Sequence, residues 1–249
     1  MSGRPLITAR SVCAANDCVE FSLVFDAELD TISSPADNSK KPPAAGQSAT
    51  GTVQRLERAA AARRTLAVVS VPGITLRLLA GNGGASENEA ELLALRAEVC
   101  GDGDGDGAAA AARQLRVRRR QPGFVLAEAR HGGYLVAYAS GLPLRPSTSW
   151  WKDLTTQLPD SVTAEYPGRT FALTELLVRP SWRRQGIGRA LHDLILDGRA
   201  EERATLTVPP GAAAAQAAFR SWGWRRLART AGPGPDVPVL DVLLAGLPL

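Results

Sequence analysis

One stretch of the sequence, residues 171–196, constrains the fold more than any other. It opens with the apolar run Phe171–Leu177, which predicts a buried strand, and it closes with Ala190–Leu196, whose apolar spacing predicts a helix. Between them lies a turn that contains glycines and arginines. The sequence therefore predicts a strand that ends in a basic turn, which leads directly into a helix.

The turn has the composition of an anion-binding site. The first backbone N–H groups of a helix have no partner within the helix, and the helix dipole adds partial positive charge there. Gly186 and Gly188 carry no side chains that would keep an anion away from those N–H groups, and Arg183, Arg184 and Arg189 add full positive charge. We expect this turn to hold a pyrophosphate.

Two other phosphate-binding motifs do not fit this turn. The dinucleotide-binding fingerprint requires a third glycine at the position of Leu191, and the P-loop requires a Gly-Lys-Ser or Gly-Lys-Thr sequence, which the turn lacks. Residues 183–188 instead read Arg-x-x-Gly-x-Gly, and they follow a strand that ends in Val178-x-Pro180. In this position the pattern resembles the acetyl-CoA-binding loop of the GNAT N-acetyltransferase superfamily.

The resemblance implies acetyl-CoA as cosubstrate, no metal, and a set of residues that hold the cosubstrate. The turn would bind the pyrophosphate, and the backbone of Val178 would face the thioester region, as the bulged strand of the family does. The cofactor-binding residues carried over from the family are Leu177, Val178, Arg183, Arg184, Gln185, Gly186, Ile187, Gly188, Arg189 and Phe219.

The order of elements over residues 71–249 also resembles the family. A Gly-Gly turn joins the apolar runs 124–130 and 134–139 and predicts a β-hairpin, and the capping box Ser86–Glu89 predicts a helix start. Further strands are expected over residues 74–79, 204–208, 224–228 and 238–244, and a further helix over residues 212–222. The expected fold class is α/β: a GNAT-like mixed, mostly antiparallel twisted sheet with flanking helices, in a single domain. Residues 1–70 are expected to be a variable, largely disordered N-terminal extension.

Acetyl transfer to an amine needs a base for the amine proton and a means of stabilising the thiolate. Glu175, on the predicted strand, is the first candidate base and Glu165 is the second, because a carboxylate in a cleft can remove a proton directly or through water. A structural, hydrogen-bonded role for Glu175 stays open. For the thiolate, Tyr138, Tyr134, Tyr166 and solvent are all open, since a thiol that titrates near ~8.5 can leave unprotonated.

The acceptor is expected to lie over the irregular segment of residues 141–169. Trp150 and Trp151 beside carboxylates, together with Tyr166, suit a cationic amine with some apolar bulk. The alternative is that both tryptophans only cover the sheet. We expect a primary amine to attack directly in a ternary complex.

Two departures from the family pattern favour a second function. Ala212 takes the place of the usual Asn, and Phe219 takes the place of the Tyr that commonly protonates the departing CoA thiolate. The alternative to an enzyme is therefore a catalytically impaired acyl-CoA-binding module used for regulation or interaction.

Composition bears on three questions: nucleic-acid binding, calcium binding and the location of the protein in the cell. The chain of 249 residues has a formal net charge of +4, but its basic run at residues 116–120 lacks interleaved aromatic residues, so a solvated loop or strand edge is favoured over nucleic-acid binding. Residues 102–107 begin like an EF-hand loop, yet the twelfth position is Arg113 instead of Glu, and we expect a flexible loop there. Three scattered cysteines, no apolar leader and no apolar run of ~20 residues indicate a cytoplasmic protein outside the membrane. The acceptor and the oligomeric state stay open, a homodimer included.

Overall fold

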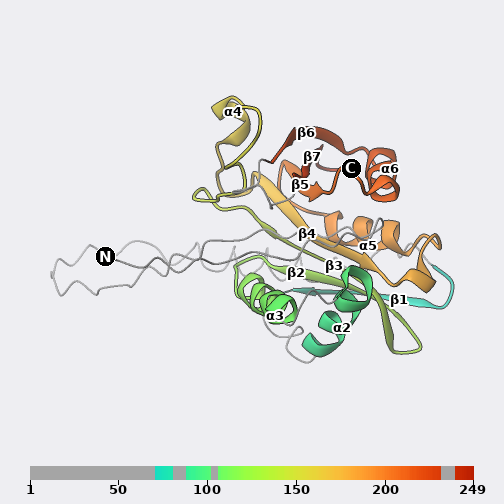
Figure 1. Cartoon of the computed structure of the whole chain (residues 1–249). Coiled ribbons are helices and arrows are strands. Elements are labelled where there is room, and N and C mark those ends of the chain that lie inside the picture. The colour runs from blue at the N-terminus through green and yellow to red at the C-terminus, as the bar shows by residue number, and fades with distance from the viewer. Residues whose placement is uncertain (1–70, 81–87, 102–105, 231–238) are drawn as a thin grey trace, which may run out of the picture. The chain divides into compact units, whose positions relative to one another are not determined.

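The computed structural model describes residues 71–80, 88–101, 106–230 and 239–249, so the predicted extension over residues 1–70 lies outside the described residues. Within them, seven strands form one sheet in the order β1-β2-β3-β4-β5-β7-β6 (Figure 1). The strands are β1 (Ile74–Ala80), β2 (Val125–His131), β3 (Tyr134–Pro143), β4 (Thr170–Val178), β5 (Arg203–Val208), β6 (Arg225–Arg229) and β7 (Asp241–Gly246). The helices are α2 (Glu89–Cys100), α3 (Asp106–Arg119), α4 (Asp160–Thr163), α5 (Ile187–Leu196) and α6 (Ala213–Ser221), with a short 3-10 helix, η1, at Pro180–Trp182. β4 and β5 are parallel and the other neighbours are antiparallel, which confirms the predicted mixed sheet.

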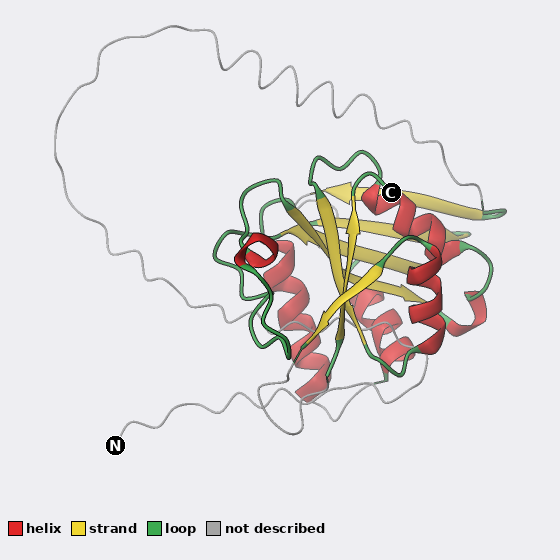
Figure 2. Cartoon of the chain, turned by 90° about the horizontal axis from the view of Figure 1, so that it is seen from above, coloured by secondary structure: helices red, strands yellow, loops and turns green. Residues whose placement is uncertain are grey.

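Helices cover both faces of the sheet (Figure 2). Leu95 of α2 and Leu115 of α3 pack in one core cluster with Leu177 of β4. The next residue of β4, Val178, faces α5, because a Cβ added at Gly188 would lie 3.7 Å from Val178 Cγ2. Neighbouring residues of a strand point to opposite faces. Therefore α2 and α3 lie on one face of β4 and α5 lies on the other.

The predicted hairpin forms between β2 and β3. Gly132 and Gly133 have φ of 54° and 87° at its turn, a conformation that side chains disfavour and that matches the twist of paired strands. β3 continues to Pro143, so the start of the segment predicted as irregular belongs to a strand. Among the described residues, no helix is both long enough and apolar enough to cross a membrane.

The predicted loop that contains the acidic repeat and the basic run is a helix from Asp106 onward. α3 includes the alanines 108–112, and alanine is the strongest helix former. Its Leu115 and Arg118 are 4% and 2% exposed. The prediction of a flexible loop is therefore wrong from Asp106 to Arg113, and so is that of a solvated loop or strand edge at 116–119. Burial against α2 and the sheet holds the helix in place.

Helix α2 begins at Glu89, two residues after the start that the predicted capping box implies. Its N-cap is Asn88, which makes no capping hydrogen bond and instead donates from Nδ2 to Glu128 Oε1 at 2.9 Å. Ser86 itself lies outside the described residues. The N-cap position is therefore used for a tertiary hydrogen bond to β2, and the local motif does not set the helix start.

Candidate functional site

The chain between β4 and α5 forms a turn with unusual backbone geometry. Arg184 and Gly186 have φ of 63° and 82°, in the left-handed region. Glycine adopts this conformation freely, whereas an arginine there costs roughly 1 kcal/mol. Turns that pass through left-handed residues can direct successive N–H groups to one side, which is an arrangement that binds anions.

The N-terminus of α5 is not capped by a side chain. Gly186 is the N-cap, and Ala190 N donates to Gly186 O at 3.0 Å. Ala190 is the first residue of α5 whose N–H donates within the helix, so the N–H groups of Ile187, Gly188 and Arg189 have no acceptor within the helix. A Cβ added at Gly186 would have no atom within 4 Å, so the N-cap faces open space. The positive end of the helix dipole is therefore open to solvent at this turn.

Gly188 faces a different side of the turn from Gly186. A Cβ at this position would lie 3.6 Å from Leu176 Cδ2, 3.7 Å from Val178 Cγ2 and 3.9 Å from a ring carbon of Trp222. Gly188 therefore faces β4 and Trp222, at distances where a Cβ would make ordinary contacts. Of the two glycines, Gly186 is the one that faces the solvent side of the turn.

The three arginines of the turn differ in how firmly they are held. Arg183 Nε donates to Val178 O at 3.2 Å. Arg189 Nε donates to Asp193 Oδ2 at 2.7 Å, and its guanidinium lies 5.6 Å from the Trp222 ring centroid. Arg184 is exposed. Two positive groups are thus oriented by contacts, and the third projects from the turn.

β4 and β5 are paired only at their beginnings. Their parallel register covers Thr170–Ala172 and Arg203–Thr205, although β4 continues to Val178 and β5 to Val208. In the unpaired part, Thr207 Oγ1 is buried and has no hydrogen-bond partner among the described residues. The two strands therefore separate toward their carboxyl ends, at the edge where the turn follows β4.

The first candidate base, Glu175, lies at a bulge in β4. Ser140 of β3 pairs with Glu175 while Gly141 pairs with Leu173, so Thr174 is an extra residue in β4. Such bulges re-aim side chains and occur often beside active sites. Ser140 Oγ lies 3.2 Å from Glu175 Oε2 and 3.0 Å from Thr174 Oγ1. Both residues of the bulge therefore point to the same side of the strand.

Two arginines face the Glu175 carboxylate from the α2–α3 face. Arg96 Nε and Arg118 Nη1 lie 3.6 Å and 3.4 Å from Glu175 Oε1. The Glu175 side chain is 6% exposed. Burial lowers the pKa of Arg118, and the nearby charge of Glu175 opposes that effect. Glu175 is therefore a buried, ion-paired carboxylate next to the point where β4 and β5 separate.

Tyr138 lies in the same region of the core. It is 1% exposed and packs in the cluster that contains Leu177. Burial, and after it the negative charge of Glu175, raise the pKa of Tyr138 well above its usual value. The phenol therefore keeps its proton, because its ionised form is disfavoured beside a buried carboxylate.

Comparison with known proteins agrees with this geometry. A model of the Acetyltransferase (GNAT) family matches residues 91–224, more than half of the 249 residues. The chain belongs to the GNAT acetyltransferase family. No curated protein matches it.

Two solved structures with TM-scores of 0.50 or more share the fold of this GNAT chain, and a third is similar at a lower score. The ribosomal-protein-S18-alanine N-acetyltransferase from Escherichia coli is 15% identical, with a TM-score of 0.51 over 71% of this chain and 95% of that chain. PH1933 from Pyrococcus horikoshii OT3 is 15% identical, with a TM-score of 0.50 over 70% of this chain and 100% of that chain. The PaiA N-acetyltransferase from Thermoplasma acidophilum, solved in complex with coenzyme A, is 11% identical, with a TM-score of 0.45 over 70% of this chain and 99% of that chain.

In this GNAT domain the second candidate base, Glu165, joins the 141–169 segment to the sheet. Its Oε1 accepts hydrogen bonds from Trp151 Nε1 at 2.9 Å, Thr170 Oγ1 at 2.8 Å and Arg203 Nη2 at 2.9 Å. The Glu165 side chain is 0% exposed. Thr170 begins β4, and Glu175 follows five residues later, roughly 16 Å along a strand. The structure therefore does not bring the two candidate bases together.

The aromatic residues of this segment have different exposures. Trp150 is 3% exposed and donates from Nε1 to Thr205 Oγ1 at 3.2 Å, so it covers β5. Trp151 is half-buried, and Tyr166 is 46% exposed, with its hydroxyl donating to Glu202 Oε1 at 2.7 Å. Of the three predicted acceptor-binding residues, only Trp151 and Tyr166 present surface that an acceptor can contact.

Phe219 lies inside an aromatic cluster between α5 and α6. It is 1% exposed, and its ring centroid lies 5.3 Å from that of Trp222 and 5.8 Å from that of Trp224. A bound molecule cannot reach this ring unless side chains shift. Its predicted place beside the CoA sulfur therefore stays a prediction that requires rearrangement of the cluster.

Sequence reasoning missed the centre of this cluster, His192. Trp224 Nε1 donates to His192 Nε2 at 2.9 Å, so Nδ1 carries the proton and donates to Asp193 Oδ1 at 2.8 Å. His192 is 0% exposed, and burial lowers its pKa while Asp193 opposes that effect. The only sequence signal was its position among the apolar residues of a predicted helix. Asp193 also holds Arg189, so this neutral histidine connects the turn to the core under α6.

Proposed function

We propose that this chain is an N-acetyltransferase that moves the acetyl group of acetyl-CoA to a primary amine. The turn ahead of α5 carries the proposal, because uncapped N–H groups and three arginines meet there at the edge where β4 and β5 separate. The pyrophosphate of the cosubstrate binds the turn through residues 183–189. The pantetheine arm then enters between the strands, along the backbone of Leu177 and Val178.

The reaction needs a proton to leave the amine before or during attack. The amine nitrogen attacks the thioester carbonyl carbon in a ternary complex, a C–N bond forms, and the C–S bond breaks with its electron pair remaining on sulfur. Glu175 takes the amine proton through a water molecule, because its carboxylate is buried. The thiolate takes a proton from solvent, and Tyr138, which keeps its own proton, can only donate a hydrogen bond.

The acceptor lies against the 141–169 segment. Trp151 and Tyr166 provide aromatic surface that a cationic amine can contact. Trp150 supports this surface from below through its hydrogen bond to Thr205.

A second candidate function is an acyl-CoA-binding module without turnover. Two observations favour it: Phe219 stands where the family commonly has a phenolic acid, and Glu175 is paired with two arginines, which disfavours proton uptake. Both functions require the turn, and they differ only in whether the thioester is consumed.

Thiol release from acetyl-CoA, measured over a panel of primary amines, separates the two functions. Turnover with one amine supports the enzyme, whereas binding of acetyl-CoA by calorimetry without thiol release supports the module. Once an acceptor is found, Glu175→Gln should lower kcat by about 10²–10⁴-fold if Glu175 is the base. Asp197→Asn is the control and should change kcat by less than about threefold, because Asp197 is exposed at the end of α5.

A further inference from the structure

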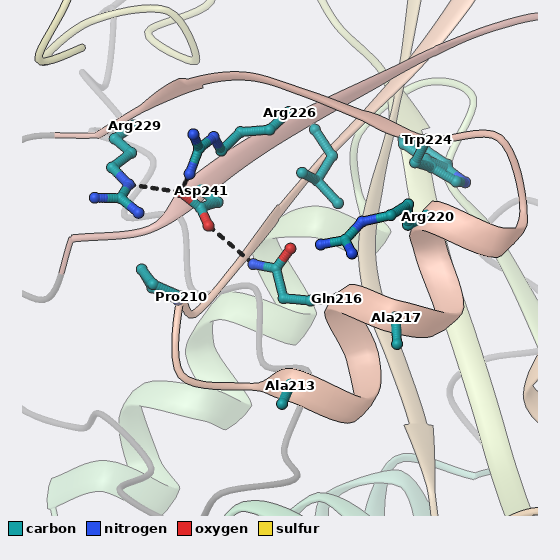
Figure 3. A pocket seen from close by; sticks show the side chains of 10 residues that line it. Pro210, Ala213, Gln216, Ala217, Arg220, Trp224, Arg226, Arg229 and Asp241 are labelled. Atoms are coloured by element: carbon teal, nitrogen blue, oxygen red, sulfur yellow. Dashed lines mark hydrogen bonds and ion pairs between the residues drawn. The ribbon is translucent and has the colours of Figure 1, made fainter.

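A basic groove lies between α6 and the β6–β7 pair, outside the site already described. The groove is open to solvent and has a volume of about 640 Å³, within the range of small-molecule sites. Figure 3 shows Gln216, Ala217 and Arg220 of α6 on one side and Arg226, Arg229 and Asp241 on the other. We call this space the α6 groove.

The helix presents different residues to the groove and to the core. Ala213, Gln216, Ala217 and Arg220 line the groove, and their spacing of three and four residues places them on one face of the helix. Phe219 lies on another face, buried toward His192 and the tryptophans. The helix therefore presents Gln216 and Arg220 to the α6 groove and Phe219 to the aromatic cluster, and Trp224 borders both.

A bulge in β6 turns two arginines toward the groove. Arg226 pairs with Leu243 and Ala228 pairs with Val242, so Leu227 is an extra residue. Without it, Arg226 and Arg229 would point to opposite faces of the strand. Both instead reach Asp241 Oδ1, at 3.7 Å and 2.8 Å.

Asp241 pairs with Arg226 and Arg229 but leaves about half of each arginine side chain exposed to solvent. Its side chain is 6% exposed, whereas Arg226 and Arg229 keep 57% and 47% of theirs exposed. The other carboxylate oxygen accepts from Gln216 Nε2 at 3.0 Å, which ties the strand pair to α6 (Figure 3). The guanidinium groups are therefore held in place before any ligand arrives, which lowers the entropic cost of binding.

Arg220 adds a third positive charge from the opposite wall. It is exposed, and no ion pair or hydrogen bond to its side chain occurs among the described residues. Figure 3 shows its guanidinium directed into the space between Gln216 and Arg226. Of the described residues that line the groove, three are arginines and Asp241 is the one acid, so the groove has an excess of positive charge.

We infer that the α6 groove binds a small organic anion that carries at least two phosphate or carboxylate groups. Guanidinium groups bind both kinds of group through paired N–H donors. The apolar surface of Pro210, Ala217 and Leu243 gives room for an organic frame between the charges. This inference concerns a second ligand, and it does not depend on acetyl transfer.

Calorimetric titration of the full chain with citrate and with inorganic pyrophosphate tests the inference. At least one probe should bind saturably, and Arg220→Gln and Arg226→Gln should each weaken that binding by at least about fivefold. Arg225→Gln is the matched control: Arg225 is exposed and lines a different surface with Leu244, so its loss should change the affinity by less than about twofold. If only citrate binds, the ligand of the groove carries carboxylate groups. If only pyrophosphate binds, it carries phosphate groups.

The variant Arg184→Gln distinguishes the groove from the turn. If it removes the binding while Arg220→Gln does not, the anion occupies the turn and the inference is wrong. It is also wrong if neither probe binds at concentrations up to about 10 mM, or if Arg225→Gln weakens binding as much as Arg226→Gln. A failure of acetyl-CoA binding at the turn leaves these outcomes unchanged, because citrate is titrated without it.

Discussion

The turn ahead of α5 and the α6 groove both gather arginines, but they hold them in different ways. In the turn, all three arginines come from residues 183–189, and the uncapped end of α5 adds its own positive charge. In the groove, Arg220 comes from α6, whereas Arg226 and Arg229 come from β6 and are paired with Asp241 of β7. Local backbone geometry builds the first region, and tertiary packing builds the second.

This difference determines what each region tolerates. The turn depends on charge and on two left-handed residues, so it can lose affinity without losing stability. The groove depends on the buried carboxylate of Asp241, which also ties α6 to the sheet. Removal of this carboxylate should therefore lower the free energy of unfolding. The following predictions test this contrast, beginning with the largest expected effect.

Charge reversal in the turn should affect binding alone. Arg184→Glu should weaken acetyl-CoA binding by about 10- to 100-fold, because it removes a charge-assisted contact and adds a repulsive carboxylate. Arg184 is exposed, so the melting temperature should stay unchanged. Calorimetry and thermal denaturation measure the two quantities. Arg225→Glu, the same change at an exposed site on β6, should leave the affinity within about twofold; equal losses would show that only the overall charge matters.

Removal of the carboxylate in the groove should affect stability instead. Asp241→Asn should lower the free energy of unfolding by about 1–3 kcal/mol, because Arg229, Arg226 and Gln216 lose a buried charged acceptor. Urea denaturation measures the change. Asp197→Asn is the control, since Asp197 is exposed and should cost less than about 0.5 kcal/mol. A neutral effect of Asp241→Asn would mean that the groove is not held together by this carboxylate.

The same contrast explains what the sequence could predict. The strand, turn and helix over residues 171–196 were predictable because each depends on neighbours within a few residues. The bulges at Thr174 and Leu227 were not predictable, because pairing with another strand defines them. α3 was not predicted because its alanine-rich sequence is interrupted by charged residues and follows a glycine-rich repeat. Its Arg118 is buried beside Glu175 of a strand distant in the sequence.

The two glycines of the turn offer a sharper test of its local geometry. Gly186→Ala should destabilise the protein by about 1 kcal/mol, because φ of 82° places a Cβ in the disfavoured left-handed region. Gly188→Ala should cost less, since its Cβ would meet neighbours only at ordinary contact distances of 3.6 Å and more. Thermal denaturation compares the two variants. The opposite order would show that close packing of α5 on β4, and not the left-handed N-cap, limits this turn.

The smallest effect concerns His192, which connects the two regions through Asp193 on one side and Trp224 on the other. Burial lowers the pKa of His192 in the folded protein. Below a pH of about 6.5 the unfolded chain therefore binds more protons at this residue than the folded protein does, and the free energy of unfolding should fall as the pH decreases from 7 to 5. Protonation would also place a donor opposite the Trp224 N–H, which now has an acceptor. His192→Gln cannot titrate at this position, so its stability should depend less on pH than that of the unchanged protein. Urea denaturation at several pH values measures these slopes. If His192→Gln keeps the full slope, groups other than His192 set the pH dependence of stability.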